Sequence, residues 1–168
     1  MTSMGVAATL QTVGVADCKV SADPEDLLIT YALGSCLGIS IYDPVARVGG
    51  LLHVMLPDSS IDPSKAELNP SMFVDSGVPR LFRECYRQGA QKQRLVVKVA
   101  GGATSRLRGD EDHFQIGRRN FTMLRKLLWG NGVMLKGHDV GGCTSRTMSL
   151  HIGTGVVSLK INGELREL

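Results

Sequence analysis

The chain has 168 residues, of which 43% are hydrophobic and 21% charged, a usage that excludes a disordered chain and is typical of a globular protein. A net charge of +3, one Trp, three Tyr and four Phe do not supply the basic tail and aromatic platforms of a nucleic-acid binder. No apolar run reaches the roughly 18 residues of a membrane-spanning helix. We therefore expect one domain over residues 1–168, with no nucleic-acid partner and no membrane insertion.

Apolar alternation predicts two strands in the first half of the chain. Apolar residues alternate from 37 to 41 and predict a strand that ends in a turn at Asp43-Pro44. Residues 48–56 predict a second, more deeply buried strand, and we expect the two strands to pair as a hairpin. Residues 58–70 are rich in Asp, Ser and Pro and predict a surface loop.

The second half predicts helices as well as strands. Apolar residues at 78, 81, 82 and 85 follow the spacing of an amphipathic helix, which Gly89 can end. The later elements, in chain order, are a buried strand that leads into a glycine turn over 94–103, a helix over 121–130, a strand over 133–140 and a hairpin of 147–152 with 156–161. Strands outnumber helices, so we predict an α+β fold in which two helices cover a largely antiparallel or mixed sheet.

The four cysteines, at positions 18, 36, 85 and 143, are widely spaced and form no Cys-x-x-Cys pair. This spacing argues against a zinc ribbon or a thioredoxin-like motif and favours free thiols in a reducing cytoplasm. No basic residue precedes Lys19, so the N-terminus does not predict a signal peptide. We expect a cytoplasmic protein without a metal or a cofactor.

Cys36 is a candidate nucleophile because of the Gly-Ser pair before it. A free cysteine is usually a small buried hydrophobe, and that interpretation applies to Cys36 as well. However, Gly34 can adopt backbone angles closed to other residues. A tight turn there would aim the amides of Ser35 and Cys36 at a group approaching the sulfur, as an oxyanion hole requires.

His53 lies in the second predicted strand, among apolar residues. A buried histidine needs a hydrogen-bond partner or uses its titrating nitrogen in chemistry, and the sequence leaves both interpretations open. If the two strands pair, Cys36 and His53 face each other across them. The pair is then a candidate nucleophile and base.

Two other kinds of site match parts of the sequence less well. Residues 34–38 match the spacing of a G-x-S-x-G nucleophile elbow with cysteine in place of serine, but the elbow requires a helix where residues 37–42 predict a strand. We therefore reject an α/β-hydrolase. The candidates for a metal site, which match no recognised ligand spacing, are His138, Asp139, Cys143 and His151.

An ordered set of motifs covers about residues 27–160. It consists of Thr30-x-x-Leu-Gly-Ser-Cys36, Gly49-Gly50-x-x-His53-x-Met-Leu-Pro57, residues 98–103, residues 116–120 and Asp139-x-Gly-Gly through Arg146. This set resembles the CheD family, the chemoreceptor glutamine deamidases of chemotaxis. Ala100 and Ser145 depart from the family pattern, and neither belongs to the set of Thr30, Cys36 and His53.

The resemblance implies an activity and its residues. Cys36 is the expected nucleophile, His53 the base that raises its thiolate population, and Thr30 the group that orients His53, with the amides near Gly34 and Ser35 binding the oxyanion. The implied substrate is a glutamine side chain of a methyl-accepting chemotaxis receptor, hydrolysed through a thioester without a cofactor. The implied fold is similar to that of glutamine-deamidating toxins. We also expect the pKa of the Cys36 thiol to be lowered.

The resemblance also implies a second protein partner, the phosphatase CheC, and we expect a monomer. Two other function classes stay open: a non-catalytic adaptor that binds the receptor and CheC, and a cysteine hydrolase of small amides or esters. Positive charge concentrates in two groups that can steer an acidic partner. These groups are Arg80, Arg83, Arg87, Lys92 and Arg94, and Arg118, Arg119, Arg125 and Lys126.

Overall fold

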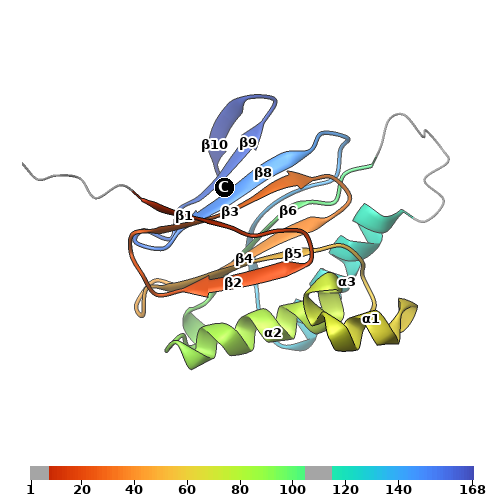
Figure 1. Ribbon diagram of the computed structural model, residues 1–168, viewed down its shortest axis with the longest axis horizontal. Coiled ribbons are helices and arrows are strands. Elements are labelled where there is room, and N and C mark those ends of the chain that lie inside the picture. The colour runs from red at the N-terminus through yellow and green to blue at the C-terminus, as the bar shows by residue number, and fades with distance from the viewer. Residues whose placement is uncertain (1–7, 105–114) are drawn as a thin grey trace, which may run out of the picture.

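The computed structural model describes residues 8–104 and 115–168, which form two five-stranded sheets and a layer of helices (Figure 1). The first sheet contains, in spatial order, β1 (Thr9–Thr12), β3 (Asp26–Leu33), β8 (Arg146–His151), β9 (Val157–Ile161) and β10 (Glu164–Glu167). The second contains β2 (Asp17–Ser21), β5 (Val48–Val54), β4 (Leu37–Asp43), β6 (Val96–Gly101) and β7 (Leu135–Val140). The helices are α1 (Pro63–Leu68), α2 (Val74–Arg87) and α3 (Ile116–Gly130), with short 3-10 turns η1 (Ser59–Ile61), η2 (Pro70–Met72) and η3 (Lys92–Arg94).

The second sheet lies in the middle of the molecule, with the helices on one side and the first sheet on the other (Figure 1). Successive side chains of β5 show this arrangement, because neighbouring residues point to opposite faces of a strand. Leu52 packs in the core between the second sheet and the helices, together with Leu81 and Leu124. Leu51 packs in the other core with Met148, between the two sheets. Strands β4 and β5 are buried along their whole length, which explains their nearly continuous apolar sequences.

The predicted α+β class and mixed sheets are confirmed, as is the hairpin of β4 with β5. The surface loop predicted over residues 58–70 is wrong in part, because the segment contains η1 and α1. The side chains of Asp58 and Asp62 cap these turns by accepting the N–H groups of Ser60 and Lys65. Strands β1 and β10 are mostly exposed and carry no apolar alternation from which to predict them. Among the described helices, none is long and apolar enough to span a membrane.

Candidate active site

Cys36 lies where the chain crosses from the first sheet to the second. Strand β3 of the first sheet ends at Leu33, and β4 of the second begins at Leu37, so residues 34–36 form the link. Cys36 is half-buried and packs against the core between the sheets. A nucleophile in this position is held by two rigid sheets and still reaches the surface.

Two neighbouring segments hold this link in place. The carbonyl oxygen of Cys36 accepts the N–H of Gly102 at 2.9 Å, and that of Gly34 accepts the N–H of Ala103 at 2.8 Å. Gly101 has φ +115°, and a Cβ there would collide with the Cys36 carbonyl oxygen, so this close approach requires glycine. The Gly-Gly motif after β6 therefore shapes the backbone of the candidate nucleophile.

The expectation that Gly34 supplies an unusual backbone conformation is wrong. Gly34 does not have positive φ, and a Cβ added to it would meet nothing within 4 Å. Ala32 takes the left-handed conformation instead, with φ +56°, inside an irregularity between Thr30 and Leu33 where β3 shifts register against β8. The bulge turns the chain out of the first sheet before it reaches Gly34.

His53 is almost fully buried, with 1% of its surface exposed, and lies on β5 beside the candidate nucleophile. It is paired directly with Gly38 on β4. Cys36 precedes Gly38 by two residues, which makes it a diagonal neighbour of His53 across the hairpin, at about 7 to 8 Å between diagonal positions. Long side chains interact over such a separation, so the expectation that the hairpin brings the two residues together agrees with its register.

Thr30 contacts His53 from the opposite sheet and determines which nitrogen of the imidazole carries the proton. Its Oγ1 donates to the carbonyl oxygen of Val13 at 2.8 Å and lies 2.7 Å from Nδ1 of His53. A hydroxyl has one hydrogen, so Oγ1 can only accept from His53. Nδ1 therefore carries the proton, and Nε2 of the neutral ring has a free lone pair.

The site also contains a residue that the motif analysis did not single out. Asn120 on α3 is completely buried, and its Nδ2 donates to the carbonyl oxygens of Ser35 at 3.0 Å and Met55 at 3.1 Å. Ser35 precedes Cys36, and Met55 follows His53 by two residues, so one side chain joins the two segments. The sequence signal was its place at the end of the motif of residues 116–120, just before the predicted helix, which by itself indicates no role.

Burial shifts both titrating groups towards their neutral forms. It lowers the pKa of His53, and it raises the pKa of the Cys36 thiol, which the cysteine's own backbone N–H lowers in part. The expected lowering of the thiol pKa is therefore wrong for this structure. Both shifts favour the pair of thiol and neutral imidazole over the pair of thiolate and imidazolium.

The other cysteines and the candidate metal ligands do not form a second active site among the described residues. Cys85 is fully buried in the core next to the helices, and burial raises the pKa of Cys18 to about 11, so neither is an activated thiol. The described residues include no group of three or more His, Cys, Asp or Glu side chains arranged to hold a metal ion. Asp139 instead forms an ion pair with Arg146, and the ring of His138 faces Phe121.

Comparison with known proteins gives consistent matches. A family model described as CheD, chemotactic sensory transduction, matches residues 55–161. A probable chemoreceptor glutamine deamidase CheD of Solibacter usitatus is 51% identical over 156 residues, covering 93% of this chain and 91% of the relative. CheD 1 of Syntrophus aciditrophicus is 51% identical over 93% of this chain and 97% of its own length. CheD 2 of Anaeromyxobacter dehalogenans is 40% identical over 95% and 99%.

Proposed function

Because the chain belongs to the CheD family, whose curated relatives are named probable chemoreceptor glutamine deamidases, we propose that it hydrolyses glutamine side chains of chemoreceptors to glutamate. It is then a protein-glutamine glutaminase with Cys36 as nucleophile. The observation that carries the proposal is the buried hydrogen bond of Thr30 with Nδ1 of His53. It leaves Nε2 of His53 without a hydrogen-bond partner, on the strand next to Cys36. An adaptor that only binds has no need of an oriented base.

The first half of the reaction forms a thioester. Nε2 of His53 takes the proton of the Cys36 thiol as the sulfur attacks the carboxamide carbon of the substrate glutamine. The carbonyl oxygen becomes an oxyanion, which the amides of Ser35 and Cys36 stabilise in the link between β3 and β4. His53 then returns the proton to the nitrogen, the C–N bond breaks, and ammonia leaves.

The second half restores the enzyme. Water attacks the thioester carbon while Nε2 of His53 removes one of its protons. The C–S bond breaks, Cys36 regains a proton from His53, and the product is a glutamate side chain. Each turnover consumes one water and releases one ammonia, and no cofactor enters the balance.

Thr30 acts as a positioning residue through Nδ1 of His53. The hydrogen bond keeps the imidazole in the tautomer whose Nε2 is basic, as the third member of other catalytic triads does. Unlike a carboxylate, the hydroxyl contributes no negative charge to stabilise an imidazolium. This neutral partner, together with burial that lowers the pKa of His53, favours an enzyme in which the charged intermediate is short-lived.

The test is mass spectrometry of the cytoplasmic portion of a chemoreceptor after incubation with the chain. Conversion of an amide to an acid adds about one mass unit at the modified glutamine and releases ammonia. Wild-type chain should convert particular receptor glutamines, whereas Cys36→Ala should convert none. Binding of the receptor without conversion by the wild type would identify an adaptor, and rapid hydrolysis of free glutamine would identify a hydrolase of small amides.

The proposed function also suggests a cellular location and a second protein partner. We propose that the chain acts as a monomer in the cytoplasm, where the receptor portions that it modifies are exposed, and that CheC binds over the Cys36 face in competition with the receptor. CheC and the receptor should then each protect Cys36 from alkylation. Continued alkylation at the free rate in the CheC complex would place CheC on another surface.

A further inference from the structure

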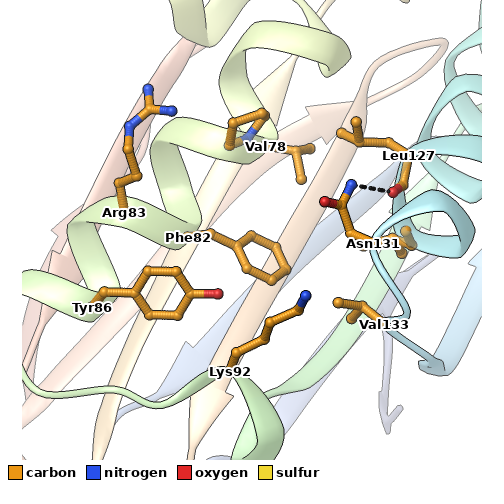
Figure 2. A pocket seen from close by; sticks show the side chains of 10 residues that line it. Val78, Phe82, Arg83, Tyr86, Lys92, Leu127, Asn131 and Val133 are labelled. Atoms are coloured by element: carbon orange, nitrogen blue, oxygen red, sulfur yellow. Dashed lines mark hydrogen bonds between the residues drawn. The ribbon is translucent and has the colours of Figure 1, made fainter.

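A hollow of about 340 Å³ opens between α2 and α3, in the helical layer (Figure 2). Its apolar walls come from both helices and from the segment after α3, with Phe82 pointing into the space from α2 and Leu127 and Val133 on the opposite side. Phe82 and Leu127 are only partly buried. A partly exposed apolar hollow of this size is large enough to receive side chains of another molecule.

The rim of this hollow is positively charged. Arg83 and Lys92 line it, and both are exposed. A second hollow of about 380 Å³ shares Lys92 and Val133 with the first and adds Lys136 and Met134, whose side chain is 71% exposed. No Asp or Glu is among the residues that line the two hollows. Together they form a surface, here called the α2–α3 groove, with an apolar floor and a cationic rim.

Helix α3 connects this groove to the candidate active site. Asn120 near its start holds the segments of Cys36 and His53, and Asn131 at its end lines the groove. Eleven residues of helix correspond to about 16 Å. A further hollow between them is lined by Met123, which lies one turn before Leu127 on the same side of α3.

The lining of that intermediate hollow carries the positive charge towards the active site. Its residues are Pro57, Asp58, Gln115, Arg118, Arg119, Thr122, Met123 and Lys126. Three of the eight are cationic, and the one carboxylate, Asp58, accepts the N–H of Ser60. One extended partner lying along α3 would therefore meet cations at both ends.

We propose that the α2–α3 groove is a second binding site for the chemoreceptor, which receives an acidic amphipathic helix of the receptor away from the glutamine being converted. The inference rests on the proposed function and extends it to substrate selection. Apolar side chains three or four residues apart on such a helix enter the two hollows, and its carboxylates meet Arg83, Lys92 and Lys136.

Two physical arguments favour this occupant. A pocket that admits a single carboxamide cannot distinguish one receptor glutamine from another, so selection requires binding energy from contacts remote from the reacting bond. A second copy of this chain would present the same cationic rim, and apposed like charges disfavour association. An acidic helix of the protein substrate complements both the charge and the apolar floor.

The test compares two substrates with one double charge reversal, Arg83→Glu together with Lys92→Glu. The substrates are the cytoplasmic portion of a chemoreceptor and a short peptide around one modified glutamine, too short to reach from Cys36 to the groove. We expect the double variant to raise KM for the receptor about tenfold with kcat unchanged, and to leave the peptide kinetics unchanged. Added salt should raise the receptor KM of wild type more than that of the variant.

Lys160→Glu, which reverses an exposed charge on β9 of the other sheet, is the control matched in charge to each single reversal, Arg83→Glu or Lys92→Glu. Its receptor KM should stay at the wild-type value. An equal rise in this control would assign the effect to the net charge of the chain. An equal loss on the short peptide, or an unchanged receptor KM in the double variant, would overturn the proposal.

A binding measurement separates this inference from the proposed function. The receptor portion is titrated into Cys36→Ala chains with and without the two reversals, so that no turnover is needed. Weaker binding with the reversals supports the groove even if wild type converts no glutamine, in which case only the proposed activity fails. Unchanged binding overturns the groove while conversion by wild type still supports the deamidase. Self-association that the reversals abolish, with unchanged receptor binding, would assign the surface to a second copy.

Discussion

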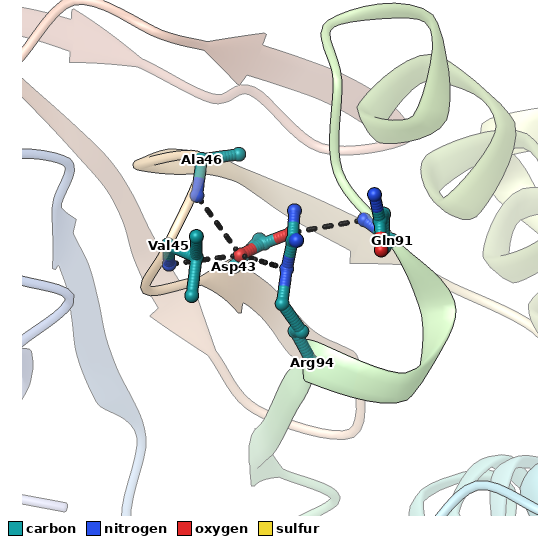
Figure 3. Close-up of polar contacts among 5 residues, drawn as sticks. All are labelled: Asp43, Val45, Ala46, Gln91 and Arg94. Carbon is teal, nitrogen blue, oxygen red and sulfur yellow. Dashed lines mark hydrogen bonds and ion pairs between the residues drawn. The ribbon is translucent and has the colours of Figure 1, made fainter.

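The two ends of strand β4 differ in how well their buried polar groups are hydrogen-bonded. At the end away from Cys36, the Asp43 carboxylate is completely buried, and both of its oxygens accept hydrogen bonds (Figure 3). It accepts the backbone N–H groups of Val45, Ala46 and Gln91, and both of its oxygens accept Nε of Arg94. Burial raises the pKa of this carboxyl, but the bonds from Arg94 and the three amides lower it more, to about 2.

At the near end, beside Cys36, polar atoms are left without partners. Among the described residues, the buried side-chain nitrogen and oxygen atoms that make no hydrogen bond are Nε2 of His53 and Oδ1 of Asn120. Leaving a buried acceptor unpaired costs about 1 to 3 kcal/mol. The fold therefore satisfies every hydrogen bond of the buried Asp43 carboxylate but leaves one buried nitrogen of His53 without a partner. The difference predicts that changes at the Asp43 end alter stability, whereas changes at the Cys36 end alter activity.

The largest expected effect is that of Cys36→Ala, which should abolish deamidation of the receptor. The lost group is small and half-buried, so the free energy of unfolding should fall by no more than about 1 to 2 kcal/mol. Ammonia release and thermal unfolding measure the two quantities. Cys143→Ala is the control and should keep its activity, and equal loss in both variants would contradict a unique nucleophile.

Replacing Thr30 should have the next largest effect on activity. Thr30→Val keeps the shape but cannot accept from Nδ1 of His53, so we expect kcat to fall about 10- to 100-fold, the equivalent of a lost buried hydrogen bond. Thr30→Ser keeps the hydroxyl and should recover most of the rate. The pH profile of Thr30→Val should also change, because the tautomer is no longer fixed. Equal kinetics in Val and Ser variants would reduce Thr30 to a structural strand residue.

A change at Asp43, at the other end of β4, should alter stability but not activity. Asp43→Asn leaves Arg94 without its carboxylate and should lower the free energy of unfolding by about 3 kcal/mol at neutral pH, with kcat within about twofold of wild type. The depressed pKa gives the sign of the pH dependence. The stabilisation is complete above the unfolded pKa near 4 and is lost as the pH falls through about 2.

Denaturant titrations of both chains at several pH values measure this effect. The difference between wild type and Asp43→Asn should therefore shrink as the pH falls from about 5 to 2. A difference that stays constant over that range would show that the charge of Asp43 does not supply the stability. A large loss of kcat in folded Asp43→Asn would remove the contrast between the two ends.

The smallest expected effects are shifts in pH dependence. Because burial lowers the pKa of His53, the imidazole stays neutral to more acidic pH, and the midpoint of the acidic limb of kcat/KM should lie below about pH 6.5.

Because burial raises the pKa of Cys36, its alkylation by iodoacetamide should increase with pH up to a midpoint above the ordinary thiol value. Peptide-resolved mass spectrometry follows this rate. A rate that is flat across neutral pH would indicate a resting ion pair instead.

Much of the fold was predictable because its central elements are defined by local patterns. Strands β4 and β5 are buried on both faces and therefore appear as nearly continuous apolar runs joined by a short turn. Helices α2 and α3 each bury one face, which produces the 3.6-residue period. The hairpin alone places Cys36, just before β4, near His53 on β5, so the candidate pair could be predicted from the sequence.

What the sequence by itself determined is therefore the α+β class, the central hairpin and the candidate pair of Cys36, just before β4, and His53, on β5. Only the tertiary structure decided their hydrogen-bond partners, the tautomer of His53 and the directions of their pKa shifts. The tautomer of His53 depends on Thr30 and Val13, which approach it from outside its own sheet, and the two segments of the site are joined by Asn120 from α3. The direction of both pKa shifts depends on burial by the complete fold. Such contacts join residues tens of positions apart, and no local period or motif spacing encodes their geometry.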